Sequence, residues 1–102
     1  MKDNQALIVV DVQKDFLETG ALPVKEGSQV VPVINRIIPK FKNVVFTQDW
    51  HPQGHISFAS SHPGIAPYST IDVSYGKQVL WPEHCVQNTS GAEFAEGLNT
   101  VF

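Results

Sequence analysis

The residues best suited to chemistry are a carboxylate and an imidazole two positions apart, Asp49 and His51, followed much later by His84. In an extended segment, side chains two residues apart lie on the same face, so Asp49 and His51 can reach one ion. His84 is the expected third ligand, because the chain could return to the same place. One carboxylate and two imidazoles suit Zn²⁺ or Fe²⁺ with open coordination positions. The sequence therefore predicts one divalent metal ion, and the competing interpretation is a loop with three solvated polar groups.

The elements that must position these residues are indicated by hydrophobic patterning. Residues 7–10 form a β-branched apolar run, typical of a strand buried on both faces of a parallel sheet. A second run at 44–46 ends close to Asp49. Between them, apolar residues at a helical spacing predict one buried stripe, made of Val30, Val33, Ile34, Ile37 and Ile38. The carboxyl ends of parallel strands form the ligand-binding edge of such a sheet, so Asp11 and Asp49 are expected there.

Local signals predict the remaining segments. Ser28 is the expected N-cap of the helix, and Pro39 is the expected stop. Residues 50–88 show no period of 2 or 3.6, so they are predicted to be irregular and functional. Residues 91–98 are predicted to form a short helix, and 100–102 to begin a third strand.

Composition and charge exclude several classes of protein. The chain has 102 residues, of which 42% are hydrophobic and 17% charged, and its net charge is −3 without a basic stripe. A nucleic-acid partner is therefore not expected. The apolar run at 6–10 is too short to span a membrane and lacks the layout of a signal peptide, so a cytoplasmic location without a membrane partner is expected.

Four segments carry motifs beyond these simple patterns. They are Val10-Asp11-Val12-Gln13-Lys14-Asp15-Phe16, Gly20-Ala21-Leu22, Thr47-Gln48-Asp49-Trp50-His51-Pro52, and Leu80-Trp81-Pro82-Glu83-His84-Cys85-Val86-Gln87 with Gly91-Ala92. Together they resemble the nicotinamidases of the isochorismatase-like cysteine hydrolases, over about residues 6–98. The first pattern is shared by the whole superfamily, whereas the third and fourth are more specific.

This resemblance implies a fold, an activity and a set of residue roles. The fold is α/β, the N-terminal part of a three-layer domain with a parallel sheet, so residues 1–102 form one incomplete domain. The activity is hydrolysis of nicotinamide to nicotinate and ammonia in NAD salvage, with the metal orienting the pyridine ring. The matching residues are Asp11 as general base for a cysteine nucleophile, Phe16 and Trp81 as the aromatic sandwich, Gln13 beside the substrate, and Asp49, His51 and His84 as metal ligands.

The chain departs from the family in its catalytic triad. The family's lysine and nucleophilic cysteine lie beyond the matched region, and neither Lys77 nor Cys85 stands at their positions. The 102 residues are therefore expected to be part of a longer enzyme and inactive alone, with Cys85 as a buried thiol. An uncovered sheet face is expected to favour a homo-oligomer or association with the missing half.

Several alternatives stay open from the residues. The chain could serve another substrate of the same superfamily, or bind metal and nicotinamide without hydrolysis. Cys85 could act as the nucleophile with Asp11 as its base. His55 and His62 remain alternative metal ligands.

Overall fold

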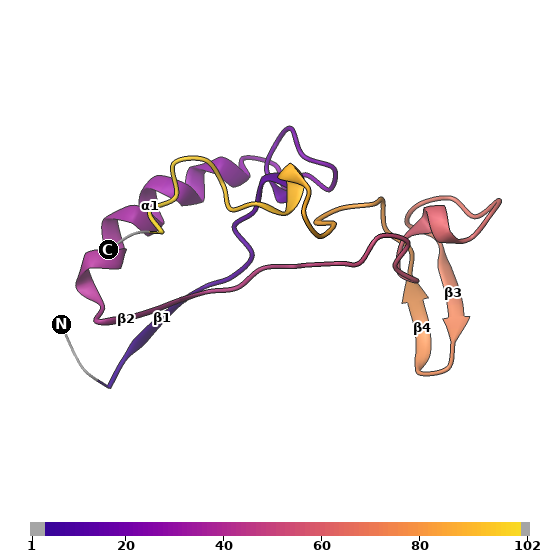
Figure 1. Ribbon diagram of the computed structural model, residues 1–102, viewed down its shortest axis with the longest axis horizontal. Coiled ribbons are helices and arrows are strands. Elements are labelled where there is room, and N and C mark those ends of the chain that lie inside the picture. The colour runs from indigo at the N-terminus through magenta and orange to yellow at the C-terminus, as the bar shows by residue number, and fades with distance from the viewer. Residues whose placement is uncertain (1–3, 101–102) are drawn as a thin grey trace.

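The computed structural model describes residues 4–100, whose elements follow one another as strand, helix, strand and hairpin (Figure 1). The elements are β1 (Ala6–Val9), α1 (Val30–Ile37), β2 (Asn43–Phe46), β3 (Thr70–Val73) and β4 (Gly76–Val79). The radius of gyration is 16.2 Å, whereas a compact domain of this length has about 13 Å. The described part is elongated, with the hairpin at the opposite end from α1 (Figure 1). No helix in this part of the chain is long and apolar enough to cross a membrane.

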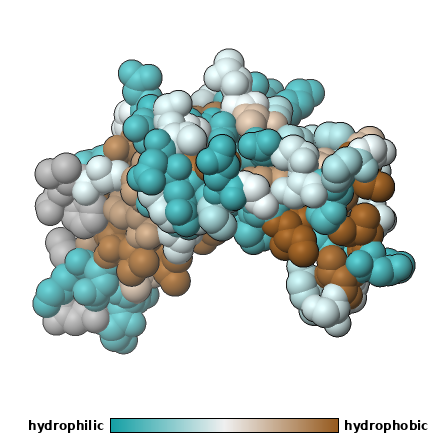
Figure 2. Space-filling view, turned by 45° about the vertical axis from the view of Figure 1, so that its right-hand side comes forward, coloured by the Kyte–Doolittle hydropathy of each residue, from teal (hydrophilic) through white to brown (hydrophobic). Residues whose placement is uncertain are grey.

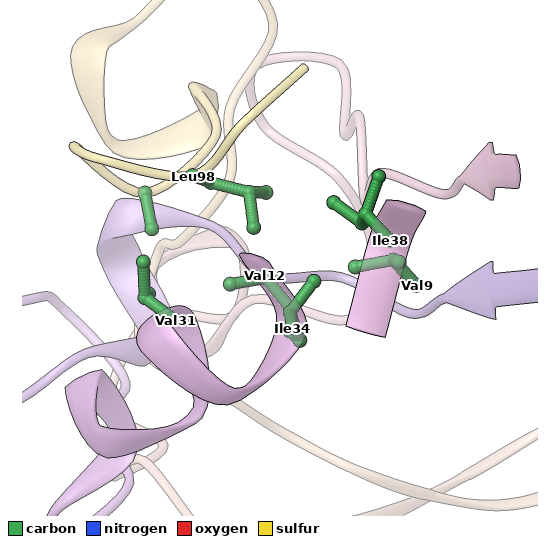
Figure 3. Packing of buried hydrophobic residues seen from close by; sticks show 7 residues of the cluster. Val9, Val12, Val31, Ile34, Ile38 and Leu98 are labelled. Carbon is green, nitrogen blue, oxygen red and sulfur yellow. The ribbon is translucent and has the colours of Figure 1, made fainter. Parts of the chain in front are cut away.

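The predicted strand, helix and strand unit is confirmed. β1 and β2 are parallel neighbours, with Leu7 opposite Val44 and Val9 opposite Phe46. α1 covers one face of this pair and encloses a small aliphatic core (Figure 3), made of Val9, Val12, Val31, Ile34, Ile38, Ala95 and Leu98. The core therefore lies beside the strand ends that lead to Asp11 and Asp49.

Two details of the helix differ from the sequence prediction. Its N-cap is Gln29 without a side-chain bond, and Ser28 instead donates its hydroxyl to Glu18 at 2.6 Å. The buried stripe passes through Val31, Ile34 and Ile38, while Val30 and Val33 are exposed. Both stripes have helical spacing, and packing against the sheet decides which one is buried. The expected stop is confirmed, because α1 ends at Ile37 and a 3-10 turn containing Pro39 follows.

The opposite face of β1 and β2 is uncovered. Ile8 and Val10 are 60% and 64% exposed, and Val45 is 50% exposed. The prediction of a strand buried on both faces is therefore wrong for the described residues, because α1 covers only one face. Hydrophobic surface reaches the exterior toward both ends of the molecule in Figure 2. The expected association with further residues or with a second chain stays a prediction.

The β3–β4 hairpin lies inside the segment that was predicted to be wholly irregular. Its strands are antiparallel, with Thr70 opposite Val79 and Val73 opposite Gly76. The local signal was the alternation of polar and apolar residues in 70–73, followed by a turn that ends at Gly76, whose φ is 129°. The prediction of an irregular stretch is correct for most of the remaining loop.

The predicted helix at 91–98 is wrong. The structure has only a 3-10 turn there, Ser90–Ala92, after which Ala95 donates its backbone N–H to the Val12 carbonyl at 2.9 Å. Phe94 forms an isolated bridge with Gln13. The segment's backbone groups are thus satisfied by distant residues rather than by a helix. Of the predicted third strand, Thr100 is irregular, and residues 101–102 lie outside the described part.

Candidate metal and substrate site

Asp49 and His51 lie in the extended segment that follows β2, and His84 lies in the segment that returns from the hairpin. Backbone bonds join the two segments, because His51 N–H donates to the Cys85 carbonyl and Gln87 N–H donates to the His51 carbonyl, both at 2.8 Å. This pairing brings together one possible ligand atom each from Asp49, His51 and His84, all within 4.8 Å of one another. The structure therefore places the three predicted ligands in one cluster.

The imidazole tautomers suit a metal site. The Nδ1 atom of His51 lies 3.1 Å from the His84 carbonyl, and Nδ1 of His84 lies 2.7 Å from the Pro82 carbonyl. A carbonyl oxygen can only accept, so each Nδ1 carries a proton, and in the neutral imidazoles each Nε2 keeps its lone pair. His84 is buried, and its Nε2 lies 3.8 Å from Oδ2 of Asp49. Two imidazole nitrogens and one carboxylate oxygen fit a single divalent ion.

Phe58 forms the apolar floor of this cluster and was missed by sequence reasoning. It is fully buried, and its ring meets His51 at 5.1 Å and His84 at 5.6 Å between centroids, both edge-on. Such packing fixes the orientation of imidazole ligands. Its position depends on an isolated bridge to Trp81, 23 residues away in sequence (81 minus 58), so no local signal could have identified it.

The two other histidines lie outside the ligand triplet in the described structure. Ser57 donates its backbone N–H to Nδ1 of His55 at 3.1 Å, so a neutral His55 carries its proton on Nε2. His62 directs Nε2 to the Ile56 carbonyl at 2.7 Å. In His51 and His84 the Nδ1 atom bonds to a backbone carbonyl and Nε2 is left for a metal ion. Neither His55 nor His62 shares this arrangement.

Gln13 is fully buried, and its amide is used by backbone groups. Its Nε2 donates to the carbonyls of Asp49 at 2.9 Å and Ala92 at 2.8 Å, and its Oε1 accepts the Asp49 N–H at 2.8 Å. The side chain therefore holds the Asp49 backbone in place. The predicted contact between Gln13 and a substrate stays untested.

Asp11 lies at the end of β1 with φ 53°, in the left-handed region. Thr47 donates its hydroxyl to Oδ1 at 2.7 Å and accepts the Asp11 N–H at 3.1 Å, so the carboxylate is held against β2. Asp11 and Phe16 both line a cavity of about 320 Å³, together with apolar residues and Lys25 and Glu26. None of the three candidate ligands lines this cavity. An orienting hydroxyl suits a general base, and that role stays a prediction.

The two predicted aromatic residues have different neighbours. The Phe16 ring packs edge-on against His84 with centroids 5.5 Å apart, which places it beside the ligand cluster. The half-buried Trp81 meets Tyr68 at 6.0 Å in a perpendicular contact. The structure thus shows Phe16 at the cluster, and the sandwich of a flat ring between Phe16 and Trp81 stays a prediction.

Cys85 follows a predicted ligand in sequence, but its thiol is inaccessible. The residue is fully buried, and burial, with the charges of Asp15, Asp49 and Asp11, raises the pKa of the thiol to about 12. A thiol with such a pKa is almost entirely protonated at neutral pH, so it is a poor nucleophile. The expected buried thiol is present.

Comparisons with known proteins agree with this architecture. A model of the Isochorismatase domain family matches residues 5–101. The nicotinamidase of Acinetobacter baylyi is 53% identical over 97 residues, which cover 95% of this chain and 45% of that protein. The chain therefore spans about half the length of this relative.

Solved structures show the same relationship. A nicotinamidase/pyrazinamidase of Acinetobacter baumannii superposes with a TM-score of 0.93 at 52% identity, covering 97% of this chain and 48% of the other. A pyrazinamidase of Pyrococcus horikoshii, solved in complex with zinc, gives a TM-score of 0.70 at 45% identity over 93% of this chain and 46% of its own. Because the family model extends over all the residues that form the parallel unit and the ligand cluster, the chain belongs to the isochorismatase family.

Proposed function

We propose that these residues form the metal- and ring-binding part of a nicotinamidase, which hydrolyses nicotinamide to nicotinate and ammonia for NAD salvage. The observation that carries the proposal is the cluster of Asp49, His51 and His84, whose possible ligand atoms lie within 4.8 Å of one another. Phe16 packs against this cluster, as a ring-binding site requires. Relatives that bear the name nicotinamidase support the assignment.

Asp49, His51 and His84 would hold one divalent ion, Zn²⁺ or Fe²⁺. The donor set suits either ion, and a relative was solved in complex with zinc. When bound, the ion supplies a Lewis-acidic position that can accept the lone pair of a ring nitrogen. The two Nδ1–H bonds to backbone carbonyls keep both imidazoles in the orientation and tautomer that this task needs.

Phe16 and Asp11 would act on the substrate itself. The Phe16 ring offers an aromatic surface against which a flat pyridine can pack, and Trp81 is proposed for the other face. Asp11 would accept the proton of a thiol nucleophile, since its Oδ1 is held by the Thr47 hydroxyl. In the described structure no hydrogen bond occupies its second oxygen.

Turnover needs a thiol that these residues do not offer. Cys85 is the only cysteine of the 102 residues, and it is fully buried with a raised pKa. We therefore expect these residues to bind and orient nicotinamide, while the attacking thiol comes from outside them. Purified chain incubated with nicotinamide should release no appreciable ammonia, and ammonia release at the rate of the related nicotinamidases would refute this expectation.

The ring-nitrogen contact can be tested by comparing two ligands. Benzamide has the same carboxamide and ring size as nicotinamide but lacks the ring nitrogen. In calorimetry with zinc-loaded chain, nicotinamide should bind at least about tenfold more tightly than benzamide, a difference of about 1.4 kcal/mol. A chelator or the His84→Ala variant should remove this preference. Equal affinity for both ligands, or a preference that survives chelation, would favour another substrate of the family.

A further inference from the structure

Asp15 is a second carboxylate near the ligand cluster with no part in the chemistry above. It lies in the 3-10 turn Lys14–Phe16, between a lysine that pairs with Glu93 at 2.6 Å and the ring that packs on His84. Its Oδ2 accepts the backbone N–H of Cys85 at 2.8 Å, and its Oδ1 accepts that of Ala21 at 3.2 Å. The side chain therefore joins the ligand-bearing loop to the turn that carries Phe16.

Two glycines leave room for Asp15. A Cβ added to Gly91 would overlap the Asp15 carboxylate, and a Cβ added to Gly20 would overlap the Asp15 backbone. Gly91 has no positive φ, so its role is close approach rather than an unusual backbone conformation. A side chain at position 91 would therefore displace the Asp15 carboxylate.

The bond from Asp15 reaches the ligand loop at a strained residue. Cys85 has φ 48°, a left-handed conformation that costs a non-glycine residue about 1 kcal/mol or more. This conformation turns the chain between His84, which faces Asp49, and Val86, which pairs with His51. Cys85 is fully buried, and the Asp15 carboxylate is the acceptor for its N–H within the protein.

We propose that Asp15 is a positioning residue of the metal centre. Its carboxylate holds the Cys85 backbone in the conformation that directs His84 toward Asp49 and His51, and it ties Phe16 to the same loop. This inference rests on the metal site proposed above. Removal of outer-shell groups that orient metal ligands typically changes metal affinity by about 10- to 100-fold.

The chemistry of the site requires an acceptor on both oxygens of Asp15. An asparagine can direct its carbonyl to the Cys85 N–H, but its NH₂ group then faces the Ala21 N–H, a donor. That second contact is exposed, so the mismatch can be relieved by water. Asp15→Asn should therefore keep most of the metal affinity, and Asp15→Ala should lower it.

Titration with Co²⁺, followed by the visible absorption of the bound ion, tests this role. Asp15→Ala should weaken Co²⁺ binding by about 10- to 100-fold and alter the absorption spectrum. Asp15→Asn should restore at least half of that loss on a logarithmic scale. Asp72→Ala is the matched control, since it removes a carboxylate that is 82% exposed on the hairpin, and it should bind Co²⁺ like the unmodified chain.

A double-mutant cycle separates positioning from a general loss of stability. Gly91→Ala should weaken Co²⁺ binding because its Cβ displaces the Asp15 carboxylate. In the Asp15→Ala background the added methyl has room, so the same substitution should have little further effect on Co²⁺ affinity. If Asp15→Ala fails to fold, judged by circular dichroism, Gly91→Ala and Asp15→Asn decide the question by the same titration.

The possible outcomes distinguish this inference from the metal site itself. Loss of Co²⁺ binding in His84→Ala, together with unchanged affinity in the folded Asp15 and Gly91 variants, would overturn the role of Asp15 alone. Unchanged affinity in His84→Ala would overturn the site and the role together. Weakened affinity in Asp15→Ala and Gly91→Ala, with rescue by Asp15→Asn, supports the positioning role.

Discussion

The unit formed by β1, α1 and β2 is held by aliphatic packing, whereas the loops that carry the ligand cluster are held by polar side chains that bond to backbone groups. In the first region, Val9, Ile34 and Ile38 are buried between the helix and the strands. In the second, Gln13 and Asp15 bind backbone groups of segments distant in sequence. Irregular backbone cannot satisfy its own N–H and C=O groups, so side chains must do it. Side-chain volume should therefore govern stability in one region, and hydrogen-bond satisfaction in the other.

The largest effect is expected in the aliphatic region. Ile38 is 2% exposed, so Ile38→Ala should lower the free energy of unfolding by about 2–5 kcal/mol through lost burial and a cavity. Val45→Ala, on the uncovered face at 50% exposure, is the matched control and should change it by less than about 0.5 kcal/mol. Urea denaturation of both variants measures the difference. Similar losses would mean that the uncovered face is buried in solution by association.

Replacing a polar side chain with an apolar one of similar volume tests the second region. Gln13→Leu leaves the N–H and C=O of Asp49 without their partner, which should cost about 1–3 kcal/mol for a buried group. Gln48→Leu is the control, because Gln48 also donates to Ala92 at 2.9 Å but its side chain is exposed. The free energy of unfolding should fall clearly more in the Gln13 variant. Equal values would show that volume, not hydrogen bonding, governs this region as well.

Cys85 gives a smaller effect that depends on pH. Its folded pKa is raised to about 12 from an ordinary value of 9.0, so above pH 9 the unfolded chain releases a proton that the folded chain keeps. The stabilising contribution is therefore complete below pH 9 and is lost progressively as the pH rises toward 12. Urea denaturation from pH 8 to pH 10.5 should show a steeper loss of stability in the unmodified chain than in Cys85→Ala.

Alkylation gives an independent check on the same thiol. At pH 8, iodoacetamide should modify Cys85 much more slowly in the folded chain than in urea, because reaction needs the accessible thiolate. Mass spectrometry measures the modified fraction. Rapid labelling of the folded chain would contradict the burial of Cys85 and restore it as a candidate nucleophile.

The smallest effect is expected outside both regions. Lys77 pairs with Asp72 at 2.8 Å on the hairpin, and the two side chains are 75% and 82% exposed. Solvent screens such a pair, so Lys77→Ala should change the free energy of unfolding by less than about 1 kcal/mol. The same urea assay measures it. A larger loss would mean that the hairpin contributes to folding as the aliphatic region does.

The two regions also differ in how far they could be predicted from the sequence. The parallel unit was predictable because its apolar runs and helical spacing are local and periodic. Which of two overlapping stripes became buried, through Val31 rather than Val30 and Val33, depended on how α1 packs on the sheet. The hairpin has a short alternating pattern, which was overlooked within a long loop.

The ligand cluster was predictable in residue type but not in geometry. Motif and spacing indicated Asp49, His51 and His84, yet no local signal indicates Phe58 beneath the imidazoles or the left-handed Cys85 beside them. The helix expected at 91–98 is absent because its backbone groups also depend on distant partners. Its backbone groups bond to residues near Val12, which the sequence places about 80 positions away.

The sequence by itself determined the family, the parallel unit and the identity of the candidate ligands, because these depend on residue type and short-range periodicity. The tertiary structure decided which tautomer each histidine adopts, why Gly91 must lack a side chain, and that Cys85 is buried beyond reach. These properties depend on partners far apart in the chain. Asp15 and Cys85, for example, are 70 positions apart, yet one hydrogen bond joins the turn that carries Phe16 to the loop that carries His84.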